Sequence, residues 1–218
     1  MLSQLTHTYP IHPNKVALEV LHQRTRFDLL REENMASEEQ PADTRVVEGW
    51  TGRVFEDFAV GDLYYHPFGR TVTEADNHSF TLMTQNVARV HVDSAFAAGT
   101  EFGRPLMNST FTLALVTGQS TIDLSMNVFA NLGWDEVRLP HPVFAGDTIR
   151  SRSKVLSVRA SQSRPNLGVV TVATEGFNAG GVVVISFRRT FMVYRRGHLP
   201  PVAEHRPDES SLPSADPS

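Results

Sequence analysis

The chain has 218 residues, 40% of them hydrophobic, which is enough for one domain with a buried core. A net charge of −4 at pH 7 gives no general attraction to nucleic acid or to an anionic membrane, and no apolar run is long enough to cross a bilayer. The absence of cysteine excludes disulfides, thiolate metal sites and thiol nucleophiles. The first residues do not resemble a secretory signal, so we expect a cytoplasmic protein.

Residues 1–47 are predicted to form an N-terminal extension and linker. The stretch "VALEVLHQRTRFDLLREE" has apolar residues at helical spacing and favours a short amphipathic helix, and the polar "NMASEEQPADT" favours a linker. Met35 lies inside this linker and is a candidate start of a shorter product. Residues 197–218 are rich in Pro, Ser and charge, which predicts a disordered tail. The domain itself is then expected to span residues 48–196.

The domain is predicted to open with a strand in "FEDFAVGDLYYHPFGRTV", which mixes aromatic and β-branched residues. Thr73 and Asp76 then have the spacing of a capping box and predict the start of a helix in "TEADNHSFTLMTQ". Phe80, Met83 and Val87 recur at helical spacing after it.

Two further helices are predicted before the chain becomes β-rich. A short helix in "VDSAFAAGTEFG" is expected to be capped by Asp93 and ended by Gly99. The next, in "NSTFTLALVTGQSTIDL", has Asn108 or Ser109 as a candidate N-cap and apolar residues all round, so we expect it to be buried on every side.

The C-terminal half predicts long strands in "VFANLGWDEVRL" and "GDTIRSRSKVLSVRAS", followed by a hairpin that turns at residues 178–181. Arg189 interrupts an apolar strand face and requires either a partner or a place at the sheet edge, for example at a dimer contact. Helices precede antiparallel strands, which indicates an α+β fold. A curved antiparallel sheet wrapped around the buried helix fits this order.

The stretch "TQNVARVHVDS" holds the candidate chemistry. His91 is the side chain suited to moving protons near neutral pH, and the nearby helix start offers backbone N–H groups to an oxyanion. Taken alone, this pattern favours structural roles. A single His between valines is more often half-buried and bonded to backbone, Asp93 is better explained as a helix cap, and Asn86 as a helix-ending residue.

A resemblance changes that balance. Four stretches between about Trp50 and Arg196 carry it: "GRTVTEADNHSFTLMTQN", "HVDSAFA", "EFGRPL" and "HPVFAGDTI". In these stretches and in their order, the chain resembles the MaoC-like dehydratases, the hot-dog-fold family of R-specific enoyl-CoA hydratases. The resemblance implies a hot-dog fold and reversible hydration of a 2-enoyl-CoA to an R-3-hydroxyacyl-CoA, without a metal or other cofactor. It also implies at least a homodimer.

The family's hydratase motif maps onto this stretch with departures. Its histidine falls on His91, its catalytic aspartate on Asn86 and the preceding glycine on Gln85. An asparagine cannot take a proton but can hold a water, so His91 would act alone as base and acid while Asn86 positions the water. Where many members have histidine-glycine, this chain has Asn108 and Ser109, and the thioester carbonyl would meet backbone N–H groups there, such as that of Ser109.

The chain looks most similar to a subgroup acting on short branched or carboxylated acyl groups, of the methylglutaconyl-CoA or mesaconyl/methylmalyl-CoA type. A substrate carboxylate needs a cation, for which Arg89 and Arg104 are candidates, although exposed surface arginines are equally consistent. An amide at Asn86, in place of the family's aspartate, would then avoid electrostatic repulsion between two carboxylates. Arg159 and Arg164 are candidates for the CoA phosphates, although a solvated loop is slightly favoured there.

Two other functions remain open at this stage. The amide at Asn86 supports a non-catalytic subunit that binds acyl-CoA or accompanies an active hot-dog chain. Thioester hydrolysis on the same fold would require a carboxylate near the carbonyl, whereas Glu74, Asp76 and Asp93 all have capping explanations. The sequence leaves the acyl group and the direction of the reaction in the cell undetermined.

Overall fold

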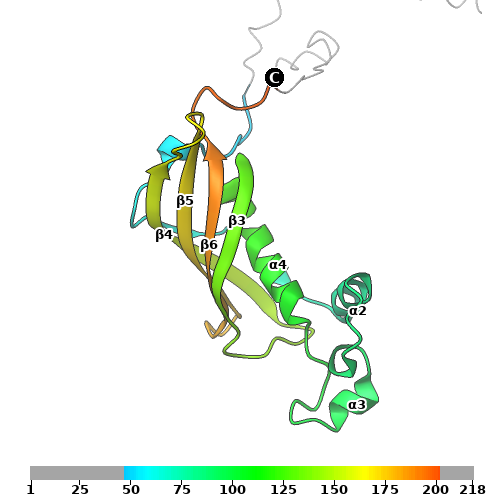
Figure 1. Ribbon diagram of the computed structural model, residues 1–218. Coiled ribbons are helices and arrows are strands. Elements are labelled where there is room, and N and C mark those ends of the chain that lie inside the picture. Colours follow the sequence, from blue (N-terminus) through cyan, green and yellow to red (C-terminus); the bar gives the residue numbers. More distant parts are fainter. Residues whose placement is uncertain (1–46, 202–218) are drawn as a thin grey trace, which may run out of the picture. The chain divides into compact units, whose positions relative to one another are not determined.

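The computed structural model describes residues 47–201 (Figure 1). The predicted amphipathic helix, the linker with Met35 and most of the predicted tail lie outside the described residues. Within residues 47–201, no helix is long and apolar enough to cross a membrane.

The elements follow the predicted order of short strands, helices and then long strands. In chain order they are η1 (Phe55–Asp57), β1 (Leu63–Tyr65), β2 (Arg70–Thr71), α2 (Glu74–Met83), η2 (Arg89–His91), α3 (Ser94–Ala98), α4 (Ser109–Gln119), η3 (Thr121–Ser125), β3 (Val128–Arg138), β4 (Thr148–Ala160), β5 (Leu167–Phe177) and β6 (Val183–Tyr194).

The sheet is antiparallel, with strand order β1-β4-β5-β6-β3 and β2 paired to β4. Its β5–β6 hairpin turns where the sequence predicts, with Gly181 in the left-handed region at φ 78°. The sheet curves around α4, which lies across one of its faces, while α2 and α3 lie beyond one end of α4 (Figure 1). The predicted α+β architecture is confirmed.

Helix α4 is only partly enclosed by the described chain. Phe111 and Val116 are buried against the sheet, but Ala114 and Gly118 are exposed. The expectation that α4 is buried on every side is therefore wrong for this chain by itself, because one sheet can cover only one side of a helix. The open side forms a groove of about 460 Å³ with β3. Its lining residues are Thr110, Leu113, Ala114, Thr117, Gly118, Asn131 and Trp134.

The core consists of two apolar clusters. The cluster on the side of β2 contains Val72, Met107, Phe111, Val116, Val143, Ile149, Val184, Ile185 and Phe187. The other contains Phe58, Leu124, Val155, Val170, Val172, Phe191 and Val193. Several polar side chains are buried as well, and they belong to segments that pack against both clusters.

One group of buried polar side chains centres on His66. Its Nδ1–H donates to the Asp123 carboxylate at 2.8 Å, and its Nε2 accepts from the Ser153 hydroxyl at 2.9 Å. The Thr174 hydroxyl lies 2.8 Å from that of Ser153 and completes the chain of hydrogen bonds. Burial lowers the pKa of His66 below its ordinary value of 6.5, against the opposing effect of Asp123. His66 is therefore a neutral, fully bonded core residue.

Arg189 finds its partners inside the chain. It is 2% exposed, its Nε donates to Asn131 Oδ1 at 2.8 Å, and its second guanidinium nitrogen donates to Ser120 Oγ at 3.0 Å. The guanidinium carbon also lies 5.0 Å from the centre of the Phe191 ring. Burial lowers the pKa of Arg189 to about 10, so the group remains a cation at neutral pH.

The caps predicted for the shorter helices are present. Thr73 and Asp76 form the capping box of α2, and the Asp93 side chain accepts from the Phe96 N–H at the start of α3. The face of α2 differs from the expectation, because Met83 and Val87 are 74% and 89% exposed. The buried residues of α2 are polar, Asn77 and Thr81.

Candidate active site

His91 ends the short helical turn η2, and one of its two ring nitrogens is already engaged. His91 Nδ1 lies 3.0 Å from the main-chain oxygen of Leu106. Because a carbonyl oxygen can only accept, Nδ1 carries the hydrogen in this bond. In the neutral ring Nε2 is then left with a free lone pair, which is the form that a general base requires.

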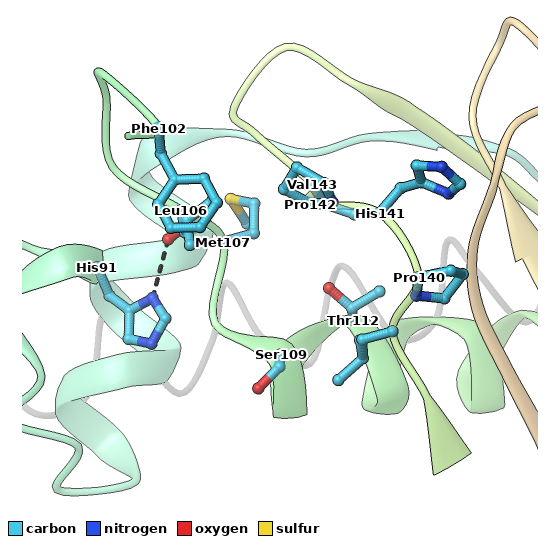
Figure 2. Close-up of a pocket in the computed structure, with 11 residues that line it drawn as sticks. His91, Phe102, Leu106, Met107, Ser109, Thr112, Pro140, His141, Pro142 and Val143 are labelled. Atoms are coloured by element: carbon cyan, nitrogen blue, oxygen red, sulfur yellow. Dashed lines mark hydrogen bonds between the residues drawn. The ribbon is translucent and has the colours of Figure 1, made fainter. Parts of the chain in front are cut away.

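The His91 ring borders a pocket of about 380 Å³ that is largely apolar. It is lined by His91, Phe102, Leu106, Met107, Ser109, Thr112, Leu139, Pro140, His141, Pro142 and Val143. In Figure 2 the segment from Pro140 to Val143 and the first turns of α4 face each other across this space, with His91 at one end. The pocket thus brings together two predicted site residues, His91 and Ser109.

The start of α4 is capped by Asn108. Its Oδ1 accepts from the Thr110 N–H at 3.0 Å, and its Nδ2 donates to Thr81 Oγ1 at 3.2 Å. Asn108 is 1% exposed, so the structure places it as a buried cap beneath the pocket floor. The Ser109 N–H has no partner among residues 47–201, and it lies at the positive end of the α4 dipole. A developing oxyanion in the pocket would be stabilised there.

Asn86 lies in the same loop but does not line the pocket. Its Oδ1 accepts from the Ala88 N–H at 2.9 Å, which forms a tight local turn. Gln85 before it has φ 55°, in the left-handed region that favours glycine. This conformation explains why the family motif has glycine at this position, and this chain adopts it with a larger residue.

Arg89 is occupied by neighbours in its own loop. Its Nε and a terminal nitrogen donate to Asp93 Oδ2 at 3.0 and 2.7 Å, and its guanidinium lies 4.6 Å from the centre of the Phe96 ring. The Phe96 N–H, followed by the Arg89 guanidinium, holds the pKa of Asp93 below its ordinary value. Asp93 is therefore a poor proton acceptor near neutral pH, which agrees with its predicted role as a cap.

Arg104, unlike Arg89, lines a pocket that His91 also lines. It lines a second, smaller pocket of about 100 Å³ together with His91, Asn77 and Glu74. Its guanidinium stacks 3.9 Å from the centre of the Phe144 ring. Among the two arginines considered for a substrate carboxylate, Arg104 is the one that shares a pocket with His91.

Arg159 and Arg164 are not brought to this pocket within the chain. Thr148 begins β4 close to the segment that lines the pocket, and Arg159 lies near the other end of that strand. At a rise of about 3.3 Å per residue, the separation along β4 is roughly 35 Å. Arg164 stacks 4.8 Å from the centre of the Phe129 ring at that far end.

Two residues near the site escaped the sequence analysis. His141 lines the main pocket and donates from Nδ1 to the main-chain oxygen of Val183 at 2.8 Å. Asn77 is 3% exposed and bonds to the main chain of both His91 and Leu106. The available signal for Asn77 was a pair of polar residues, Asn77 and Thr81, four apart on a helix that packs against α4.

No group of three or more His, Asp or Glu side chains in the described part of the chain could hold a metal ion. The expectation that the reaction needs no cofactor remains a prediction.

The antiparallel sheet around α4, with a histidine loop beside the helix start, defines a hot-dog domain, and solved structures agree. A MaoC domain dehydratase from Chloroflexus aurantiacus is 30% identical with a TM-score of 0.66, covering 75% of this chain and 46% of that one. A Mycobacterium tuberculosis protein with a double hot-dog fold is 24% identical with a TM-score of 0.62, covering 77% of this chain and 53% of that one. This second likeness concerns the fold alone.

The family model of mesaconyl-CoA hydratase matches residues 33–211, and the chain belongs to that family. The mesaconyl-CoA hydratase of Cereibacter sphaeroides is 32% identical over 150 residues, which are 69% of this chain and 43% of that protein. The β-methylmalyl-CoA dehydratase of Chloroflexus aurantiacus is 32% identical over 153 residues, 70% of this chain and 43% of that protein. The chain thus spans about two fifths of the length of these relatives.

Proposed function

We propose that this protein is a hydro-lyase that reversibly hydrates a 2-enoyl-CoA to the R-3-hydroxyacyl-CoA. The acyl group is short and branched or carboxylated, of the mesaconyl/methylmalyl-CoA or methylglutaconyl-CoA type. The observation that carries the proposal is the hydrogen bond from His91 Nδ1 to the Leu106 carbonyl, because it leaves Nε2 as a base in a pocket that also contains Ser109. The names of the matched relatives support the substrate class.

The proposed reaction uses residues at both ends of this pocket. His91 Nε2 removes a proton from water, and the hydroxide oxygen forms a bond to C3 of the enoyl group while the C2–C3 double bond opens. The electron pair moves to the thioester oxygen, which accepts from the Ser109 N–H. The enolate then collapses as C2 takes the proton from His91, so that one water is added and the base is restored.

His91→Ala tests this proposal directly. We expect hydration of mesaconyl-CoA, followed as loss of the conjugated enoyl absorbance, to fall by about 10²- to 10⁴-fold, the usual contribution of a general base. His198→Ala is the matched control, because His198 is exposed and lies in neither of the pockets that His91 lines. Equal rates for His91→Ala and wild type would refute the role of His91.

The hydration assay and an assay for free CoA thiol together distinguish a hydratase from a non-catalytic subunit and from a thioesterase. The wild-type protein is tested on a panel of short, long, branched and carboxylated enoyl-CoAs. If it binds acyl-CoAs but hydrates none of them, it is a non-catalytic subunit. Release of free CoA thiol would identify a thioesterase instead. The rates of hydration and of dehydration should both be measured, because the equilibrium constant of the reaction does not give the direction used in the cell.

We further propose that the protein acts as a homodimer in which a second copy covers the open side of α4. The groove between α4 and β3 is apolar, and β3 is an edge strand with an unpaired side. The matched part of the chain covers 53% of a protein with a double hot-dog fold, which supports a second hot-dog domain beside this one. The cytoplasmic location stays a prediction.

A further inference from the structure

Asn77 joins three segments that are distant in the sequence. Its Nδ2 donates to the main-chain oxygens of His91 and Leu106, each at 2.8 Å, and its Oδ1 accepts from the Asn108 N–H at 2.8 Å. The side chain is buried within the first turns of α2. Both amide hydrogens and the amide oxygen are therefore used, and an amide is the side-chain group that supplies this combination.

Two of these bonds act on the geometry of the His91 ring. The Leu106 oxygen accepts from Asn77 Nδ2 as well as from His91 Nδ1, so its two lone pairs are both occupied. Asn77 also holds the main chain of His91 itself. It thereby fixes both ends of the hydrogen bond that leaves His91 Nε2 free as an acceptor.

The third bond reaches the other functional group. The Asn108 N–H belongs to the N-cap of α4, and the next residue is Ser109, whose amide borders the pocket. One buried side chain thus connects the loop that carries the base to the helix start that would hold the thioester oxygen.

We propose that Asn77 is a positioning residue for the hydration. It keeps His91 in the Nδ1–H tautomer and holds His91 Nε2 at a fixed separation from the Ser109 amide. The inference rests on the proposed function for its catalytic meaning, whereas the tautomer is a property of the free protein. A free histidine prefers the opposite tautomer, so the Nδ1–H form needs a hydrogen-bond partner that is held in place.

Thr81 provides the matched control. It lies one turn further along α2, is 0% exposed, and its Oγ1 accepts from Asn108 Nδ2 at 3.2 Å. Its side chain therefore contributes a buried hydrogen bond to the same cap, while only its main-chain oxygen, which the substitution leaves in place, accepts from the loop before His91. Thr81→Val removes that bond and keeps the volume, so it measures the cost of a purely structural loss.

The first readout is the protonation of the His91 ring, measured by long-range ¹H–¹⁵N NMR of the full chain at about pH 8, where an ordinary imidazole is neutral. The signal is assigned by its loss in His91→Ala. We expect a protonated Nδ1 in wild type and in Thr81→Val, and a shift toward Nε2–H in Asn77→Ala. If Asn77→Ala does not fold, Asn77→Asp carries the test, because it keeps the acceptor for Asn108 and loses the amide donors.

The second readout is the kinetics of enoyl-CoA hydration. We expect Asn77→Ala to lower kcat by about tenfold to a hundredfold, as when a residue that orients a functional histidine is removed, with little change in KM. A variant that keeps the Nδ1–H tautomer and loses no more kcat than Thr81→Val overturns the proposal. If wild type hydrates no acyl-CoA, the proposed function fails, and the NMR arm still decides whether Asn77 positions His91.

Discussion

At the residue scale, the reactivity of His91 depends on where its hydrogen lies. The Leu106 carbonyl takes the Nδ1–H, and this leaves a single basic nitrogen for the pocket. Ser109 lies across the same pocket with an amide that no other described residue uses. The proposed base and the proposed oxyanion donor therefore come from two segments, the η2 turn and the start of α4, which the chain brings together only on folding.

Asn86 lies in the same loop as His91, and its predicted role in holding the water stays a prediction. Its Oδ1 is bound to the Ala88 N–H, and Asn86 does not line the pocket with His91. A carboxylate could accept the same hydrogen bond, so the local turn does not require an amide. The choice of asparagine is then consistent with a site that receives an anionic substrate.

We predict that Asn86→Asp lowers turnover on carboxylated enoyl-CoAs and changes turnover on uncharged ones less. The variant keeps the turn with Ala88, so its fold is expected to be unchanged. Added negative charge in the loop that carries His91 would repel a substrate carboxylate, which should appear mainly as a higher KM. Steady-state kinetics on mesaconyl-CoA and crotonyl-CoA make the comparison, and a higher turnover on the carboxylated substrate would contradict the idea.

At the element scale, the decisive feature is the position of α4. The helix buries Phe111 and Val116 in the core and leaves Ala114 and Gly118 open beside the edge strand β3. A helix as apolar as α4 is not expected to face water on that side. The open side is therefore the place where a second copy would add both burial and strand pairing.

If the protein is the dimer that we propose, we predict that Ala114→Arg converts it to a monomer. The new charge would lie in the apolar groove between α4 and β3, where it would be desolvated without a partner. The molar mass by light scattering measures the result. Ala179→Arg is the control, because Ala179 is exposed in the turn between β5 and β6. A dimer that survives Ala114→Arg and remains folded would place the interface elsewhere.

At the scale of the whole molecule, the core combines its two apolar clusters with buried polar side chains. His66 bonds to Asp123 and Ser153, and Arg189 bonds to Asn131 and Ser120. Both His66 and Arg189 thus have partners, which offsets their loss of water. Such bonds constrain how the sheet, α4 and η3 can be arranged, since a shift would leave buried donors unpaired.

We predict that His66 makes the free energy of unfolding depend on pH. Its pKa is lowered in the folded protein, so between 6.5 and that lower value the unfolded chain binds more protons than the folded one. The stability should be complete above about pH 6.5 and decline as the pH falls below it, by at most about 1.4 kcal/mol per pH unit from this one group. Asp123, Arg53 and Arg189 are the charged groups that influence it.

His66→Asn removes this titration, so the variant should show a shallower slope between pH 7 and pH 5 in urea unfolding. His198→Asn is the control, because His198 is exposed. The slope is compared rather than the stability itself, since the substitution also alters packing. Identical slopes for wild type and His66→Asn would mean that folding does not shift the pKa of His66.

The sequence by itself determined the elements, because their signals are local. The capping box at Thr73, the cap at Asp93, the N-cap at Asn108 and the hairpin before Val183 all depend on residues within a few positions of one another. The family motif in turn pointed to His91. The apolar pattern after Thr73 predicted the wrong buried face for α2, because the residues that α2 buries are polar and carry no hydrophobic period.

Only the tertiary structure decided how these elements make a site. The bonds of Asn77 link residues 14, 29 and 31 positions away, and that of His91 to Leu106 spans 15 positions. Hydrogen bonds between distant segments leave no periodicity in the sequence, because each depends on a single atom pair that folding brings within about 3 Å.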